Sequence, residues 1–127
     1  MRTVRGSRTF TCSSALLPNR RVKPDPANPG GVIYAGATDV AIGVTEGDPT
    51  PGPTSLPGTQ TWLIAVISRK TEDRVEIEAN DTIAVGQDVY GSANGRVSSS
   101  SAYSAVLVGT NFNANVVAGA NCAVDLY

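Results

Sequence analysis

Two glutamates, Glu76 and Glu78, form the pair of side chains whose spacing best suits catalysis. Residues two apart on a β-strand point to the same face, which places these carboxylates roughly 7 Å apart. Carboxylate pairs at a similar separation act as acid and base in glycoside hydrolysis. A solvated strand face whose charges keep the protein soluble accounts equally well for the pattern, and we favour that interpretation. We therefore predict no catalytic residue and a protein that is not an enzyme.

The remaining reactive side chains also argue against chemistry. The sequence has no histidine, which excludes Ser-His-Asp and Cys-His catalysis and histidine-ligated metal sites. Cys12 and Cys122 are too few for a four-cysteine zinc site, and we expect two separate reduced thiols rather than a disulfide. Asp39, Glu46 and Asp48 carry oxygen ligands suited to calcium but lack the spacing of a calcium-binding loop. We expect no metal and no cofactor.

The charges are divided unevenly along the chain. Residues 1–23 contain six basic groups and no acidic group, whereas residues 24–127 contain four basic and eleven acidic groups. A +6 segment thus precedes a −7 segment, and the two sum to the net charge of −1. We predict a basic N-terminal arm over 1–23 and a single β domain over 24–127.

Within this arm, Arg2, Arg5 and Arg8 recur at every third position and Phe10 follows them. Such an arm can neutralise nucleic-acid phosphates, dock on an acidic protein surface, or remain a solvated tail. We favour a protein partner and no direct nucleic-acid contact, because the body is acidic and aromatic stacking residues are few. Tyr127 at the chain end is a second candidate for an interface.

Nothing in the sequence predicts a membrane segment. The longest apolar run, 62–67, is far shorter than the roughly 20 residues that span a bilayer. The basic N-terminus is not followed by the apolar stretch of a secretory signal. We expect a protein without membrane contacts that is made in the cytoplasm.

Prolines separate the two halves of the chain. All eight lie at or before Pro57, and four of them fall between residues 48 and 58. Proline has no backbone N–H and fixes φ, so it does not occur in central strands. We predict a proline-rich surface loop over 48–58.

Short strands separated by turns dominate the remaining pattern, and no stretch shows helical periodicity. The segment 61–67 is predicted as a strand buried on both faces, and Asn94-Gly95 as a hairpin turn. The expected strands are 31–35, 39–45, 61–67, 74–80, 87–90, 96–98, 103–109 and 122–127. This arrangement predicts an all-β protein with a small β-barrel or β-sandwich.

Parts of the two halves also resemble each other. The segment 33–36 followed by 40–44 is echoed by 89–92 followed by 106–110. A duplicated β-unit fits this echo, although two unrelated hairpins produce matches of the same length.

Several motifs together resemble a known family. They are RRVK (20–23), VAIGVT (40–45), IAVGQDVY (83–90), NGRV (94–97), VGT (108–110) and VAGANCAVDL (117–126). In order and spacing they are similar to small tailed-phage head proteins of the capsid decoration, or cement, type. The resemblance covers about residues 20–127, and the sequence departs from it in the proline-rich loop and in the arginine arm.

The resemblance implies a non-enzymatic protein on the outer surface of an icosahedral phage head, assembled in the host cytoplasm. It implies a homotrimer that clamps neighbouring major capsid subunits, so the partners would be the major capsid protein and further copies of the chain. A carbohydrate-binding or adhesive β-module is the alternative, suggested by the polar segments 98–101 and 111–115. The low aromatic content disfavours it, because sugar sites usually need stacking platforms.

Overall fold

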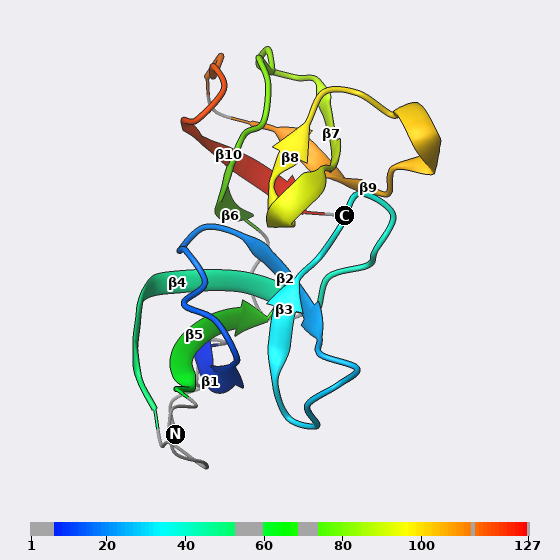
Figure 1. Ribbon diagram of the computed structural model, residues 1–127. Coiled ribbons are helices and arrows are strands. Elements are labelled where there is room, and N and C mark those ends of the chain that lie inside the picture. Colours follow the sequence, from blue (N-terminus) through cyan, green and yellow to red (C-terminus); the bar gives the residue numbers. More distant parts are fainter. Residues whose placement is uncertain (1–6, 53–59, 69–73, 113, 127) are drawn as a thin grey trace, which may run out of the picture.

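Ten β-strands in two antiparallel sheets make up most of the computed structural model, which describes residues 7–52, 60–68, 74–112 and 114–126 (Figure 1). Sheet A has the order β1 (Ser7–Cys12), β5 (Trp62–Ser68), β4 (Gly43–Pro51), β2 (Arg21–Pro24), β3 (Val32–Tyr34). Sheet B has the order β6 (Arg74–Glu78), β10 (Asn121–Leu126), β9 (Leu107–Asn111), β7 (Asp88–Gly91), β8 (Val97–Ser98). The all-β prediction is confirmed.

Each sheet curls until its two edges almost meet. A single parallel bridge, Thr11 to Gly31, joins the edges of sheet A, and Ala79 to Val97 does the same in sheet B. One bridge is not a ladder, so neither sheet is a closed barrel within the described residues. The fold corresponds to the sandwich-like alternative of the prediction, with sheet A below sheet B in Figure 1.

The two sheets repeat the same topology. In chain order, the first strand of each sheet pairs with the fifth, the fifth with the fourth, the fourth with the second, and the second with the third. Gly43 lies between Val22 and Ser68, and Gly109 holds the corresponding place in sheet B, between Val89 and Leu126. The chain therefore contains two copies of one five-stranded unit: unit A is sheet A with its loops, and unit B is sheet B with its loops.

Backbone details outside the strands repeat as well. Asn19 and Gly86 both have positive φ, 61° and 86°, and their N–H groups donate to the carbonyls of Thr45 and Asn111. The sequence echo between 40–44 and 106–110 is thus in register and confirmed. The echo between 33–36 and 89–92 is wrong, because 33 lies in β3, whose counterpart is β8 rather than β7.

Each unit has its own apolar core. The first is built around the buried Val22, Val32, Ile64 and Val66, and the second around corresponding side chains such as Val89, Val97 and Val124. Val44 of β4 belongs to the second core, with Ile67 packed against it, so the two units share apolar contacts where they meet.

The boundary predicted at residue 23 does not separate an arm from the body. All six residues of β1 pair with β5, and β2 lies inside sheet A between β4 and β3. Four of the six basic residues of 1–23 belong to the fold: Arg8 lies in β1, Arg20 and Arg21 are buried, and Lys23 is partly covered. The partners of the buried arginines lie far away in the sequence, so no local pattern distinguishes these residues from those of a solvated arm.

The predicted proline-rich loop begins later than expected. Asp48 to Pro51 belong to β4, and Thr50 and Pro51 pair with Leu63 and Trp62 of β5. Among the residues that the structure describes, β2 pairs with β4 only at Gly43 and Val44, so β5 is the one strand neighbour of β4 where the prolines lie. Pro49 falls within a register shift between Glu46 and Thr50, and Pro51 follows it, as is typical of an edge position. Residues 53–58 of the predicted loop lie outside the described residues.

Strand β5 buries the side chains of one face only, so the prediction of a strand buried on both faces is wrong. Ile64 and Val66 are buried, whereas Ala65 and Ile67 are partly exposed. Trp62, expected in the core, is partly exposed and packs against the core of sheet A. A five-stranded curled sheet buries one face, which explains the alternation.

Helical structure in the described residues is limited to η1 (Ala93–Gly95) and η2 (Ala102–Ser104), which are 3-10 turns. η2 takes up the start of the strand predicted over 103–109, and β9 begins at Leu107. Across the described ranges, no helix has the length and apolar character that a bilayer crossing requires.

The two cysteines are free and buried, one in each core, which confirms the prediction of separate thiols. Burial raises the pKa of Cys12 and raises that of Cys122 from 9.0 to about 11. The thiolate is the reactive form of cysteine, and a pKa of about 11 instead of 9.0 lowers the thiolate fraction of Cys122 at pH 8 about a hundredfold. We expect both thiols of the native protein to resist Ellman's reagent at pH 8 and to react fully in denaturant. Stoichiometric modification of the native protein within minutes would contradict this burial.

Candidate interaction surfaces

Strand β1 presents the described part of the predicted arm. Arg8 is exposed, its guanidinium carbon lies 5.5 Å from the centre of the Phe10 ring, and Phe10 packs against the core of sheet A. β1 lies at one end of sheet A, and apart from the bridge at Thr11 its outer edge pairs with no strand among the described residues. An exposed edge with a cationic side chain is a surface on which another chain can add a strand.

Three of the five predicted contact residues lie outside the described residues: Arg2, Arg5 and Tyr127. The structure brings together Arg8 and Phe10, which are neighbours on one face of β1. Because Phe10 also packs on the core, its ring serves the fold whether or not a partner contacts it. Their role in binding stays a prediction.

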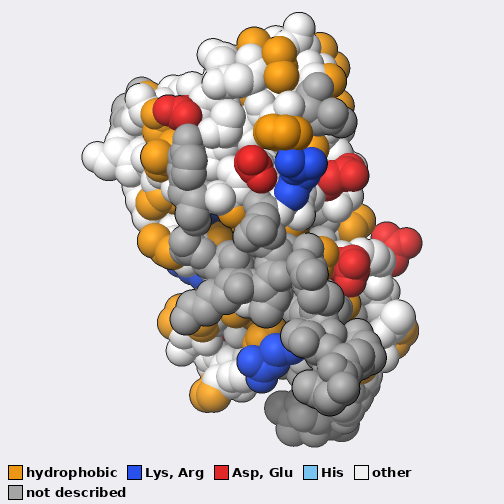
Figure 2. All heavy atoms as spheres, turned by 180° about the vertical axis from the view of Figure 1, so that it is seen from behind, with side chains coloured by type: hydrophobic (Ala, Val, Ile, Leu, Met, Phe, Trp, Pro, Cys, Tyr) orange, Lys and Arg blue, Asp and Glu red, His pale blue; other side chains and the backbone are white. Residues whose placement is uncertain are grey.

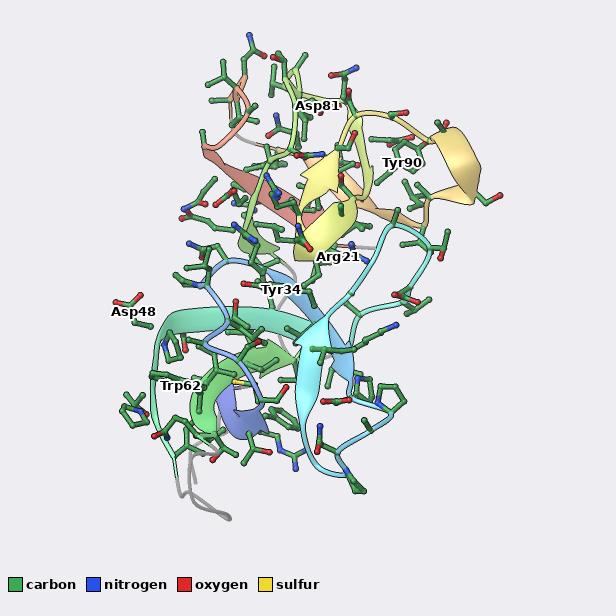
Figure 3. All side chains as sticks on the ribbon, in the orientation of Figure 1. Arg21, Tyr34, Asp48, Trp62, Asp81 and Tyr90 are labelled. Atoms are coloured by element: carbon green, nitrogen blue, oxygen red, sulfur yellow. The ribbon has the colours of Figure 1, made fainter. Side chains whose placement is uncertain are left out.

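The junction between the sheets holds the most buried charge. Arg21, where the two sheets meet (Figure 3), is 1% exposed. Its Nη2 donates to the carbonyls of Asp39 at 2.7 Å and Gly36 at 3.2 Å, and its Nη1 reaches the carbonyls of Gly36 and Arg96 at 3.4 Å. Burial lowers the pKa of Arg21 to about 10, and the charge of Asp39 partly offsets this effect. Arg21 thus ties β2, the 36–39 segment and unit B together.

Arg20 forms a second link between the units. Its Nη2 lies 3.1 Å from Glu78 Oε2 in β6, its Nη1 donates to the carbonyl of Asn94, and its guanidinium lies over the ring of Tyr34. Arg96 Nη1 approaches the same carboxylate oxygen at 3.9 Å. Glu78 is therefore engaged in holding the two sheets together.

This arrangement answers the question raised by Glu76 and Glu78. Both lie on one face of β6, as predicted, with Val75 and Ile77 buried on the other. Glu76 is exposed, whereas Glu78 is paired with two arginines. Glu76 is therefore an ordinary solvated side chain, and Glu78 is part of a structural ion pair.

Asp39 fixes the segment that receives Arg21. Its Oδ2 accepts from Lys23 Nζ at 2.9 Å and from the Gly36 N–H at 2.8 Å, and these bonds, with that to Lys23 the stronger, lower the pKa of Asp39 below 3.8. A lowered folded-state pKa stabilises the fold above pH 4, and this contribution disappears as pH falls through the folded-state pKa.

The pH dependence of Asp39→Asn tests this arrangement. We expect the variant to be less stable than the wild type by a constant amount above pH 5, and the difference to shrink below pH 4. Urea titrations at several pH values measure it. A difference that does not change with pH would show that the charge of Asp39 is not involved.

An apolar hollow of about 150 Å³ opens beside this junction. Its lining comes from matching segments of the two units, 40–44 before and within β4 and 106–108 before and within β9, together with Ile77 and Leu126. Val40 and Leu107 at its border are 64% and 49% exposed. Arg21 is the one charged residue among the lining residues that are described.

The far end of unit B carries exposed apolar side chains. Val85 and Val117 stand on two loops joined by the Ile83–Val116 bridge, and Phe112 is half exposed with Arg74 stacked 3.8 Å from its ring centre. On the opposite view in Figure 2, acidic and basic side chains are interspersed and hydrophobic ones reach the surface as separate spots. Arg74 covers one face of the Phe112 ring, so this ring is a poor platform for sugar stacking.

The polar segments that suggested sugar binding are partly used inside the fold. Ser98 is buried and donates to Asp81, which also accepts from the N–H of Ser99. Asn111 is fully buried and donates to the carbonyls of Ile83 and Ala114. These side chains shape the loops of unit B.

Comparison with known proteins gives one informative likeness. No family model and no curated protein matches the sequence. Among solved structures, the chain is similar to "head fiber gp8.5 N base in bacteriophage phi29", with a TM-score of 0.70 and 12% sequence identity over 95% of this chain and 94% of that chain. At this identity the likeness concerns the fold, and the chain shares the architecture of the base of a phage head fibre over almost its whole length.

Proposed function

We propose that this protein is a non-enzymatic structural component of a tailed-phage head. The observation that carries the proposal is the fold shared with the phi29 head-fibre base over 95% of the chain. The motifs in 20–45 and 83–126 support it independently, because they resemble head decoration proteins and were identified without reference to the fold. Of the two glutamates considered for catalysis, Glu78 is engaged in an ion pair with Arg20, so the pair does not favour an enzymatic function.

More specifically, we propose that the protein is a decoration protein on the outer surface of the capsid. It binds the major capsid protein and other copies of itself, as a trimer, and stabilises contacts between capsid subunits. The exposed Arg8 on the edge strand β1 supports this mode of binding, and the sequence adds two more positive charges before it, at Arg2 and Arg5. Many copies on one lattice gain avidity, so each single contact can be weak.

Deletion of residues 2–6 tests the docking mode. This deletion removes Arg2 and Arg5 and leaves β1 intact, whereas a longer one would uncover the edge of β5. We expect at least tenfold lower occupancy on purified capsids near 0.15 M salt, and a similar but smaller loss for Arg8→Glu, because exposed charges attract a partner at this ionic strength. Arg74→Glu, a charge reversal at an exposed arginine of unit B, is the matched control.

Two results separate the levels of the proposal. Unchanged occupancy and unchanged heat stability of particles carrying the deletion would overturn docking through the arm. Absence of the protein from purified virions, where we expect a copy number comparable with that of the capsid subunits, would overturn the head-protein assignment itself.

A further inference from the structure

The hollow at the junction has the size and lining of a ligand site. Its volume of about 150 Å³ is comparable with that of an apolar protein cavity that takes up benzene. Valine, leucine and isoleucine side chains line most of it, and two of these lining residues, Val40 and Leu107, are exposed. A ring or a short branched chain fits this space, whereas a longer one exceeds it.

The charge at this hollow is positive and poorly compensated. Arg21 is 1% exposed and forms no ion pair within 4 Å among the described residues. Asp39 is the carboxylate that acts on it, but this group is already paired with Lys23 at 2.9 Å. Carbonyl oxygens solvate the guanidinium, and both contacts of Nη1 are 3.4 Å long, beyond the usual range of 2.7–3.2 Å.

A buried cation beside an apolar space favours one kind of occupant. A neutral apolar molecule would fill the space and leave the charge uncompensated, and a small inorganic anion would leave the apolar walls uncovered. A ligand with an apolar body and one carboxylate satisfies both parts, because an anion interacts strongly with a charge that water does not screen.

We propose that the hollow between the two units binds a small organic carboxylate whose apolar part is about the size of a benzene ring. The apolar part lies against Val44, Val106 and Leu126, and the carboxylate is attracted by Arg21. This site is separate from β1 and goes beyond the proposed role on the phage head, so each stands or falls without the other.

Benzoate and its neutral analogue benzamide are the probes. In amide NMR spectra of the full-length protein, we expect millimolar benzoate to shift the signals of 40–44 and 106–108. Benzamide has nearly the same shape but no charge, and we expect its affinity to be at least tenfold lower.

Two substitutions locate the binding. Ala41→Leu fills the hollow with the side chain that the matching position 107 already carries, so it is compatible with the fold and should abolish benzoate binding. Val40→Glu places a negative charge at the border and should weaken benzoate about tenfold while leaving benzamide unchanged. Val117→Glu is its matched control, because Val117 is also 64% exposed but lies on a loop of unit B whose residues do not line the hollow.

The inference would be overturned if benzoate caused no shifts up to 50 mM, which is roughly the largest Kd that such a site would have. Equal affinity for benzoate and benzamide would also overturn it. So would benzoate binding that is unchanged in both Ala41→Leu and Val40→Glu. If Ala41→Leu fails to fold, Val40→Glu decides, since an exposed rim position tolerates the change.

Discussion

Replacing Arg21 by alanine is expected to lower the free energy of unfolding by about 3–5 kcal/mol, enough to leave little folded protein at 37 °C. The substitution removes the buried guanidinium that donates from β2 to the carbonyls of Gly36, Asp39 and Arg96. The Asp39 carbonyl would lose its Arg21 donor, whereas the carbonyls of Gly36 and Arg96 would keep only the N–H groups of Asp39 and Ser92, and buried polar groups that lose a partner are costly. Equilibrium urea denaturation measures the change from the midpoint and slope.

Arg74→Ala is the control for Arg21→Ala. Arg74 is half exposed and its ion pair with Asp125 is 3.7 Å long, so its loss should cost less than about 1 kcal/mol. Arg21→Lys keeps a charge but loses the planar fork of donors, and we expect a value between the two. If Arg21→Ala is within 1 kcal/mol of the wild type, the junction does not depend on this side chain.

Much of unit B could be predicted from the sequence, because its signals are local. Val75 and Ile77 alternate with glutamates, which marks one buried face of β6. Asn94-Gly95 supplies the positive φ values of the turn before β8, 57° and 75°. Where a pattern of two to five neighbouring residues determines the conformation, the sequence is sufficient.

The first two strands could not be predicted for a physical reason. β1 and β2 contain Arg8, Arg21 and Lys23, and a segment with several positive charges and no acid normally remains in solvent. The partners that make burial of Arg21 possible lie 15 to 75 residues away, at Gly36 and Arg96. No local pattern indicates such carbonyls. Neither the true boundary of the arm nor the candidate hollow could therefore be predicted from the sequence.

Proline in β4 shows a similar limit. The rule that excludes proline from central strands holds residue by residue, and β4 is central only near Gly43 and Val44. In the described part of the chain, β5 is its one strand neighbour from the register shift onward, which accommodates Pro49 within the shift and Pro51 after it. The position of a residue along a strand, rather than the place of the strand in the sheet, decides whether proline fits.

The two matching glycines lead to the second large effect. Gly43→Ala and Gly109→Ala are each expected to destabilise the protein by about 3 kcal/mol or more, because the new Cβ would press into the neighbouring strand. At residue 43 it would meet the carbonyl oxygen of Ile67 and lie 2.6 Å from Val66 Cγ1. At residue 109 it would meet the carbonyl oxygen of Asp125 and lie 2.8 Å from Val124 Cγ1. Backbone atoms cannot move aside as the end of a flexible side chain can.

Gly119→Ala separates this steric effect from the loss of glycine as such. Gly119 has φ of 88° and open space around its Cα, so alanine there should cost only the strain of a left-handed backbone, about 1 kcal/mol. Thermal and urea unfolding of the three variants should therefore rank Gly119→Ala well above the other two in stability. The same close approach in both units follows from their shared topology, since each glycine lies in the fourth strand of its sheet and pairs with both the second and the fifth strand. Equal stability of all three variants would mean that the strands can separate at these positions, and the matching glycines would then need another explanation.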